Sequence, residues 1–245
     1  MVDRLFADPV LARWYDAFCG WDQRDDLDFY LPLVLSAQSV LDVGCGTGLL
    51  LRRAREMGHA GRLCGLDPAD AMLDLARKSV DVEWVLGDLG SVRGENEFEL
   101  VVMTGHAFQV LVDDSELQDG LARIRSLLSA EGRFAFETRN PLVRAWERWT
   151  PEHAVEAIDS SGRVMRMEQH VQAVDGEVVR FTLTYTSPDW DAPRVSESTL
   201  RFLGADALSQ VLAEAGLHID EQFGDWDRSP LTDTSPEIIT IARRA

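Results

Sequence analysis

Three glycines follow a short apolar run and form the first pattern in the chain that indicates chemistry. The run 40–43 reads as a buried parallel strand, and Gly44, Gly46 and Gly48 follow it, just before a helix-forming segment. Glycine lets the backbone turn sharply and approach a ligand closely. A second apolar run ends in Asp67, and a carboxylate at a strand tip is placed to accept the hydroxyls of a ribose. Together these features predict a nucleoside cofactor.

The glycine spacing separates two kinds of nucleoside site. A dinucleotide site has the pattern G-x-G-x-x-G, and its third glycine would fall at Leu49. The segment 42–48 (Asp-Val-Gly-Cys-Gly-Thr-Gly) instead resembles motif I of the class I S-adenosylmethionine (SAM) dependent methyltransferases. Two alternatives stay open. A nicotinamide-dependent oxidoreductase shares the strand, the glycine loop and the ribose acid, and a SAM-binding protein without turnover would carry the same cofactor motifs.

The resemblance continues in the family's order from about residue 40 to 140. Segment 67–73 resembles the post-I segment, 85–89 resembles motif II, and 98–103 resembles the fourth strand. The resemblance implies a Rossmann-like α/β fold, SAM as cofactor and methyl transfer to a small-molecule substrate. It implies that Asp67 binds the ribose and that Asp88 faces the adenine amine. The cofactor-binding residues that it implies are Tyr15, Asp42, Gly44, Cys45, Gly46, Gly48, Leu49, Asp67, Pro68, Met72, Asp88, Leu89 and Thr104.

Two of these residues have structural alternatives. Tyr15 resembles a tyrosine that amino-terminal helices of such enzymes lay near the methionyl group of SAM, but it could equally pack its helix against the body of the protein. Asp67-Pro68 also suits the start of a helix, with Asp67 as the N-cap and proline in the first helical position.

Acceptor chemistry is less sharply indicated than cofactor binding. His106 follows the fourth predicted strand, where an imidazole could take a proton from a hydroxyl or an amine as the catalytic base, line the pocket or bond to the loop. Arg139 and Asn140, after the fifth strand, are candidate substrate-binding residues. Arg139 could bind a carboxylate or pair with Glu137, and Asn140-Pro141 could simply form a turn. No cluster of His, Cys and Asp predicts a metal site.

Composition narrows the range of partners. The formal charge of −18 and the pI near 4.6 disfavour nucleic acid, because such a protein repels phosphate backbones. No apolar run approaches the roughly 18–20 residues that span a bilayer, so no membrane partner is expected. The charged amino terminus does not read as a secretory signal, and three scattered cysteines suit reduced thiols. We therefore expect a cytoplasmic protein.

The predicted elements form an α/β fold in one domain. Helical patterns at 8–20 and 25–35 form a cap (1–36), and strands alternate with helices across a SAM-binding core (37–140). Three alternating segments at 163–173, 178–186 and 194–202 predict an inserted antiparallel lid (141–203). A helix and two strands in 204–245 complete the core. The insertion resembles the lid or dimerisation layer of sugar N-methyltransferases, and its exposed strand edges suit a homodimer.

Overall fold

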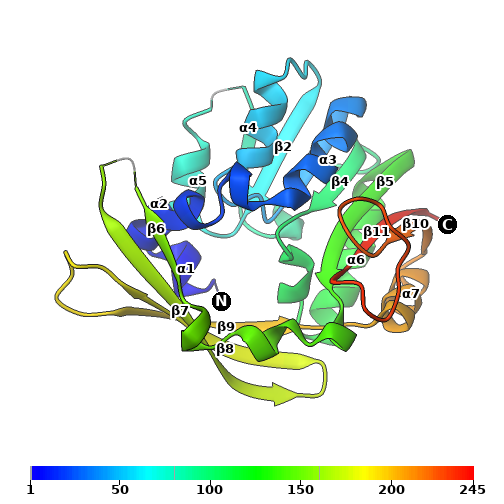
Figure 1. The fold of residues 1–245 in the computed structure, drawn as a ribbon. Coiled ribbons are helices and arrows are strands. Elements are labelled where there is room, and N and C mark those ends of the chain that lie inside the picture. The colour runs from blue at the N-terminus through cyan, green and yellow to red at the C-terminus, as the bar shows by residue number, and fades with distance from the viewer. Residues whose placement is uncertain (1, 80, 160) are drawn as a thin grey trace.

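The computed structural model describes residues 2–79, 81–159 and 161–245 and has the predicted Rossmann-like α/β architecture. Figure 1 shows a large sheet with helices on both sides and a smaller sheet beside the amino-terminal helices. Residues 1, 80 and 160 belong to the expected ranges 1–36, 37–140 and 141–203, and they lie outside the described residues. The division into four ranges stays a prediction.

Seven strands form the large sheet in the order β10-β11-β5-β4-β1-β2-β3. Six of them run in one direction, and β11 runs against its neighbours β10 and β5. The carboxyl ends of β1, β2, β4 and β5 therefore meet at the same edge as the beginning of β11. The strands are β1 (Ser39–Val43), β2 (Arg62–Asp67), β3 (Glu83–Leu86), β4 (Phe98–Met103), β5 (Leu128–Arg139), β10 (Leu217–Phe223) and β11 (Glu237–Arg244).

Apolar side chains on both faces of this sheet explain its position between two helical layers. One face packs against the apolar sides of α6 and α7, and the other against those of α3 and α4. Burial on both faces is the reason why these strands read as continuous apolar runs. The helices are α3 (Asp25–Ser36), α4 (Leu49–Glu56), α5 (Asp70–Ala76), α6 (Asp114–Leu127) and α7 (Ala205–Glu214).

The second sheet has four antiparallel strands in the order β6-β7-β8-β9, not the three that the sequence predicts. The missed strand, β6, is only four residues long and pairs with the start of β7. The other strands lie within two residues of their predicted ranges. The bounds are β6 (Val155–Ile158), β7 (Val164–Asp175), β8 (Val178–Thr186) and β9 (Arg194–Arg201).

The amino-terminal helices connect the two sheets. Helix α2 (Pro9–Phe18) begins where Asp8 accepts a hydrogen bond from the backbone N–H of Val10, and proline occupies the first helical position. One side of α2 places Leu11 and Trp14 against the second sheet. Its other side packs, together with α1 (Arg4–Ala7), against α5, the helix between β2 and β3 of the large sheet. The sequence did not predict α1.

Candidate cofactor and acceptor site

The glycine loop is held against the end of β2 by its own backbone. The N–H groups of Gly44 and Cys45 both donate to the carbonyl of Leu66, at 2.8 and 3.1 Å. The N–H of Gly46 donates to Oδ2 of Asp67 at 2.8 Å. All three motif glycines have positive φ, a conformation that other residues rarely adopt. The loop predicted from the spacing is therefore a turn at the carboxyl edge of the large sheet.

Asp67 lies at the end of β2 with its carboxylate directed into this turn. Its Oδ1 accepts a hydrogen bond from the N–H of Ala69 at 2.8 Å, and its Oδ2 accepts the Gly46 N–H. Helix α5 starts at Asp70 with Ala69 as its N-cap, so Asp67 is not the N-cap residue. Each carboxylate oxygen has a second acceptor position, and these positions are suited to ribose hydroxyls.

Asp42 carries an unpartnered polar atom at the same edge. Its side chain is 1% exposed, and its Oδ1 has no hydrogen-bond partner among the described residues. The pKa of Asp42 is raised to about 7, mainly by burial; Arg24 opposes this rise and the nearby Asp67 contributes to it. A buried acceptor without a donor is costly, and a ligand that brings a donor would satisfy it.

Gly48 has a structural role that the motif does not reveal. A Cβ at Gly48 would lie 2.2 Å from the indole of Trp84, which is fixed by a hydrogen bond from its Nε1 to the carbonyl of Ser79. The same indole covers Gly65, and Cys45 packs beside it with Leu73 and Ala76. Cys45 therefore contributes a small buried side chain, and burial raises the pKa of its thiol.

Helix α2 closes over the glycine loop from the amino-terminal side. Asp16 accepts a hydrogen bond from the hydroxyl of Thr47 at 2.6 Å and lies 3.4 Å from the guanidinium of Arg52 on α4. Tyr15 packs against the ring of Phe6 and the apolar group that includes Met72. Tyr15 therefore packs its helix against the body of the protein, which is one of the two expected alternatives. Because its helix also contacts the glycine loop, the cofactor role of Tyr15 stays a prediction.

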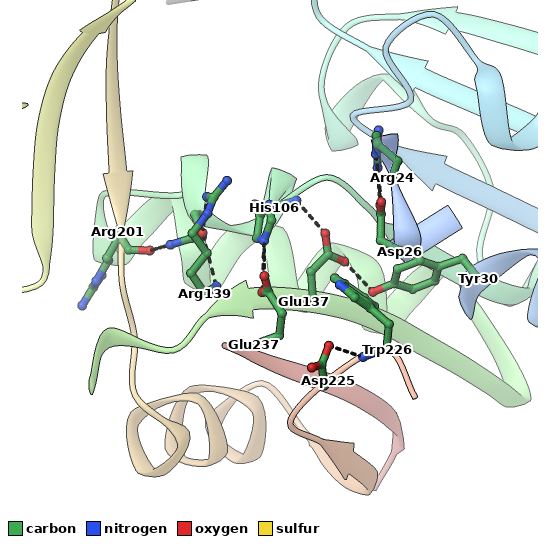
Figure 2. A network of polar contacts seen from close by, with 11 residues as sticks. Arg24, Asp26, Tyr30, His106, Glu137, Arg139, Arg201, Asp225, Trp226 and Glu237 are labelled. Atoms are coloured by element: carbon green, nitrogen blue, oxygen red, sulfur yellow. Dashed lines mark hydrogen bonds and ion pairs between the residues drawn. The ribbon is translucent and has the colours of Figure 1, made fainter. Parts of the chain in front are cut away.

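A buried carboxylate ties three parts of the edge together (Figure 2). Glu137, at the end of β5, is fully buried; its Oε1 accepts the backbone N–H of His106 at 2.6 Å and its Oε2 accepts the hydroxyl of Tyr30 at 2.5 Å. Burial and the nearby Asp26 raise the pKa of Glu137 to about 7, although both hydrogen bonds and Arg24 oppose the rise. The turn after β4 and helix α3 are therefore fixed to the same strand end.

His106 faces a second carboxylate, on β11. Its Nε2 lies 3.0 and 3.1 Å from the two oxygens of Glu237. Burial, with the cations Arg139 and Arg24 nearby, lowers the pKa of His106 well below its usual 6.5. Burial raises the pKa of Glu237 to about 8; the neighbouring Arg139 lowers it, and Glu137 raises it.

Arg24 places a cation beside these acids. Its guanidinium pairs with Asp26, donates to Oγ1 of Thr104 at 3.3 Å, and covers Gly105. A Cβ on Gly105 would meet the guanidinium at 3.0 Å, and its φ of +65° also suits glycine. Thr104, predicted from its place after the fourth strand, is therefore part of the edge and a partner of Arg24.

The two candidate substrate residues have different surroundings. Arg139 donates from its side chain to Oε1 of Gln109 at 3.0 Å, and its guanidinium lies 5.4 Å from the ring centre of Trp149. No hydrogen bond joins it to Glu137 among the described residues. The amide of Asn140 is engaged in loop structure, since its Nδ2 donates to the carbonyls of Thr232 and Ser235 and its Oδ1 accepts from Leu142.

The remaining predicted cofactor residues surround the loop at varying depth. Met72 is buried, and its Cε lies 3.6 Å from where a Cβ on Gly46 would be. Leu49 is the first residue of α4, and Pro68 is exposed. Asp88 is exposed and caps a short turn by accepting the N–H of Gly90, and the partly buried Leu89 follows it. The adenine role of Asp88 stays a prediction.

Several residues of this edge were not singled out from the sequence. They come from α3 and its approach and from the start of β11, and they include Arg24, Asp26, Tyr30 and Glu237. Trp226 packs over Phe29 and Tyr30, with ring centres 6.0 and 6.4 Å apart. A usable signal existed for Glu237 alone, since an antiparallel strand beside β5 must begin where β5 ends.

The part of the chain that the structure describes contains neither a metal-binding cluster nor a membrane-spanning helix. No group of three or more His, Cys, Asp and Glu residues there is arranged to hold a metal ion. Within the same ranges, no helix has both the length and the apolar content needed to cross a bilayer.

Comparison with known proteins places this edge in context. Residues 40–132 match the family model described as "Methyltransferase domain". A putative methyltransferase from a Geobacillus species is 26% identical over 140 residues, which are 53% of this chain and 56% of that protein. The chain spans about half the length of the curated relatives that it matches.

Solved structures resemble almost the whole chain. A SAM-bound amino pentose methyltransferase from Micromonospora echinaspora, involved in calicheamicin biosynthesis, has a TM-score of 0.70 and 22% identity and covers 96% of this chain and 97% of its own. A sugar N-methyltransferase from a Streptoalloteichus species has a TM-score of 0.71 and 21% identity, covering 93% and 91%. At these identities, the likeness establishes the shared fold.

Proposed function

Because the chain belongs to the class I SAM-dependent methyltransferases, we propose that it transfers the methyl group of SAM to a small-molecule acceptor and releases S-adenosylhomocysteine. The observation that carries this proposal is the glycine turn at the end of β1, closed by Asp67 and flanked by the unpartnered Oδ1 of Asp42. The relatives described above support a methyltransferase over a nicotinamide-dependent oxidoreductase.

The residues of this edge fit the parts of SAM. Asp67 would accept the ribose hydroxyls, and the buried Oδ1 of Asp42 would accept a hydrogen bond from the methionyl ammonium. Arg24 is a cation at the same edge and would pair with the methionyl carboxylate. Met72 and Leu89 would provide apolar contact to the adenine. When bound, SAM supplies a methyl group activated by a sulfonium.

The protein's contribution to methyl transfer is mainly positioning. An in-line displacement requires the acceptor atom to be held close to the methyl carbon in the correct direction. Helix α2 bonds to the glycine loop through Asp16 and Thr47 and would limit access of water from that side when the cofactor is bound. His106 borders the same edge and would take the proton that the acceptor must lose.

We further propose that the acceptor atom is an amine nitrogen. Four carboxyl groups, Asp26, Glu137, Asp225 and Glu237, influence one another at this edge, and the pKa is raised to about 7 for Glu137 and to about 8 for Glu237. A protonated amine would stabilise the ionised forms of these carboxyl groups and be bound by them, whereas an alcohol would not. The neighbouring structures described as amino pentose and sugar N-methyltransferases have the same fold and support this assignment.

We also propose a cellular compartment, an excluded substrate class and an oligomeric state. We expect a cytoplasmic protein, because all three cysteines are free thiols. The acidic composition argues against nucleic acid as substrate. A homodimer through the edges of the second sheet stays a prediction that light scattering would check.

Calorimetric titration with SAM, S-adenosylhomocysteine and NADH tests the cofactor assignment. We expect micromolar binding of the two adenosyl compounds and no binding of NADH. Asp67→Asn should weaken S-adenosylhomocysteine binding about 10–100-fold, because a charged hydrogen bond contributes about 1.5–3 kcal/mol. Preferential NADH binding would overturn the proposal. Binding of SAM without turnover of any amine would favour a SAM-binding protein.

A further inference from the structure

The contact between His106 and Glu237 joins two distant parts of the chain at the border of the site. Nε2 of the imidazole lies 3.0 and 3.1 Å from the two carboxyl oxygens, and the side chains are 19% and 13% exposed. Figure 2 shows the imidazole directed at Glu237 and away from Glu137, which binds only the backbone of His106. The contact is therefore a selective pairing of one ring nitrogen with one carboxyl group.

The backbone fixes both partners. His106 has a φ of +63°, and its N–H is bound by Glu137, so the turn that carries the imidazole is anchored to β5. Glu237 lies opposite Arg139 in the register of β11 and β5, and its strand is paired on both sides, with β5 and β10. The sheet and the turn therefore hold the two backbones at a fixed separation across which the side chains meet.

The charged surroundings determine which protonation states the pair can adopt. The nearby arginine favours the ionised form of Glu237, and the neighbouring acids oppose this ionisation. The titratable and charged groups that face the pair from the packed elements are Arg24, Asp26, Tyr30, Glu137, Arg139 and Asp225. Burial lowers the pKa of His106 and raises that of Glu237 to about 8, so near neutral pH the imidazole is uncharged and the carboxyl group retains its proton.

We propose that Glu237 is the positioning residue for His106 and that a single proton between them decides whether Nδ1 of the imidazole donates or accepts a hydrogen bond. When Glu237 holds the proton, its O–H donates to Nε2 and the imidazole carries its own proton on Nδ1. When that proton is lost to solvent, the imidazole proton moves to Nε2 and is donated to the carboxylate. Nδ1 then has a free lone pair.

This inference rests on the proposed methyl transfer and specifies how the site would handle the acceptor's proton. In the ionised state, Nδ1 can take a proton from a protonated amine, which leaves the nitrogen lone pair free to attack. The resulting imidazolium is stabilised by the Glu237 carboxylate on its other nitrogen. The proton then leaves to solvent at the exposed border of the pair.

Nitrogen NMR on the full chain, labelled with ¹⁵N-histidine, tests the pair directly. Long-range proton–nitrogen correlations identify which ring nitrogen carries the proton, and His106→Asn assigns the signal among the five histidines. We expect a neutral imidazole with its proton on Nδ1 at pH 6.5, and on Nε2 at pH 9.5, with a midpoint near 8. An imidazolium with an ordinary titration near 6.5, or one tautomer throughout, would overturn the proposal.

A matched pair of variants separates the contact from general charge effects. Glu237→Gln should abolish the tautomer change, while Glu131→Gln, which removes an exposed carboxyl from β5, should leave its midpoint within about 0.3 pH units. An unchanged tautomer midpoint in Glu237→Gln would contradict the assignment. These spectra require neither cofactor nor acceptor, so their failure leaves methyl transfer standing, whereas the absence of S-adenosylhomocysteine binding overturns the proposed function alone.

Discussion

The two sheets bury polar groups in different ways. At the edge of the large sheet, Asp42 and Glu137 are buried and Glu237 is partly buried, and burial raises the pKa values of all three. In the second sheet, the buried polar side chains are the hydroxyls of Ser196 and Ser198, and both are paired with the amino-terminal segment. The buried polar groups of the large sheet are therefore suited to binding a ligand or a proton, whereas those of the second sheet attach the amino-terminal segment.

Buried side-chain atoms that lack a hydrogen bond also distinguish the large sheet from the second sheet. Among the described residues, the buried side-chain atoms without a hydrogen bond are Oδ1 of Asp42, Nε of Arg52 and Oγ1 of Thr138. All three belong to the large sheet or to α4, which covers it. Selection for folding alone would satisfy such atoms internally, so their concentration here supports a ligand at this edge.

The largest expected effect concerns the glycines of the two sheets. Gly48→Ala should destabilise the protein by about 3 kcal/mol or more, because it combines an unfavourable positive φ with a contact of 2.2 Å to Trp84. Gly176, in the β7–β8 turn, has a φ of +57° and open space around it, so Gly176→Ala should cost only about 1 kcal/mol. Urea unfolding measures both. Equal losses would mean that the Trp84 contact relaxes easily.

The next prediction concerns pH. A carboxyl group with a pKa raised by folding favours the folded state below its unfolded pKa, and this stabilisation is lost as the pH rises through the folded value. For Glu137 the window runs from about 4.5 to about 7. We expect the free energy of unfolding to fall across this range, and Glu137→Gln should reduce the fall by about 1–3 kcal/mol.

The control for this pH dependence is Asp159, which directly follows β6 of the second sheet. Hydrogen bonds from Ser161 and Arg163 lower the pKa of Asp159, so its contribution has the opposite sign and is lost only in acid. Asp159→Asn should therefore leave the slope between pH 5 and 8 unchanged in thermal unfolding scans. A slope that responds to Asp159→Asn and not to Glu137→Gln would contradict the division between the sheets.

The fold could be predicted well because its signals are local. Continuous apolar runs mark parallel strands buried on both faces: β4 has its predicted bounds, β2 ends at Asp67 as expected, and β1 begins one residue before the predicted run 40–43. Strand β6 was missed because its four residues, mostly exposed, show no apolar run or turn signal, and it is fixed by pairing with β7. Tertiary pairing, and not local preference, determines such short edge strands.

The site could be predicted where its residues lie next to a motif and not where they meet through the fold. Asp67 follows from its place at a strand end. Glu237 is separated from His106 by 131 positions, and no pattern in the chain connects them. Tyr30 reads as part of an apolar helix face, and its hydroxyl gains meaning only once Glu137 is placed beside it. Contacts between distant segments require the sheet order.

The smallest expected effect concerns a buried hydroxyl of the second sheet, where we expect a loss of stability without a loss of cofactor binding. Ser196 is fully buried on β9, and its Oγ accepts the N–H of Leu5 at 2.9 Å. Ser196→Ala should cost about 1 kcal/mol, the usual contribution of one hydrogen bond, and should change S-adenosylhomocysteine affinity less than twofold. Urea unfolding and calorimetry on one preparation provide both numbers. A tenfold loss of affinity would show that docking of the amino-terminal segment controls the cofactor site through α2, and the two sheets would then act as one functional unit.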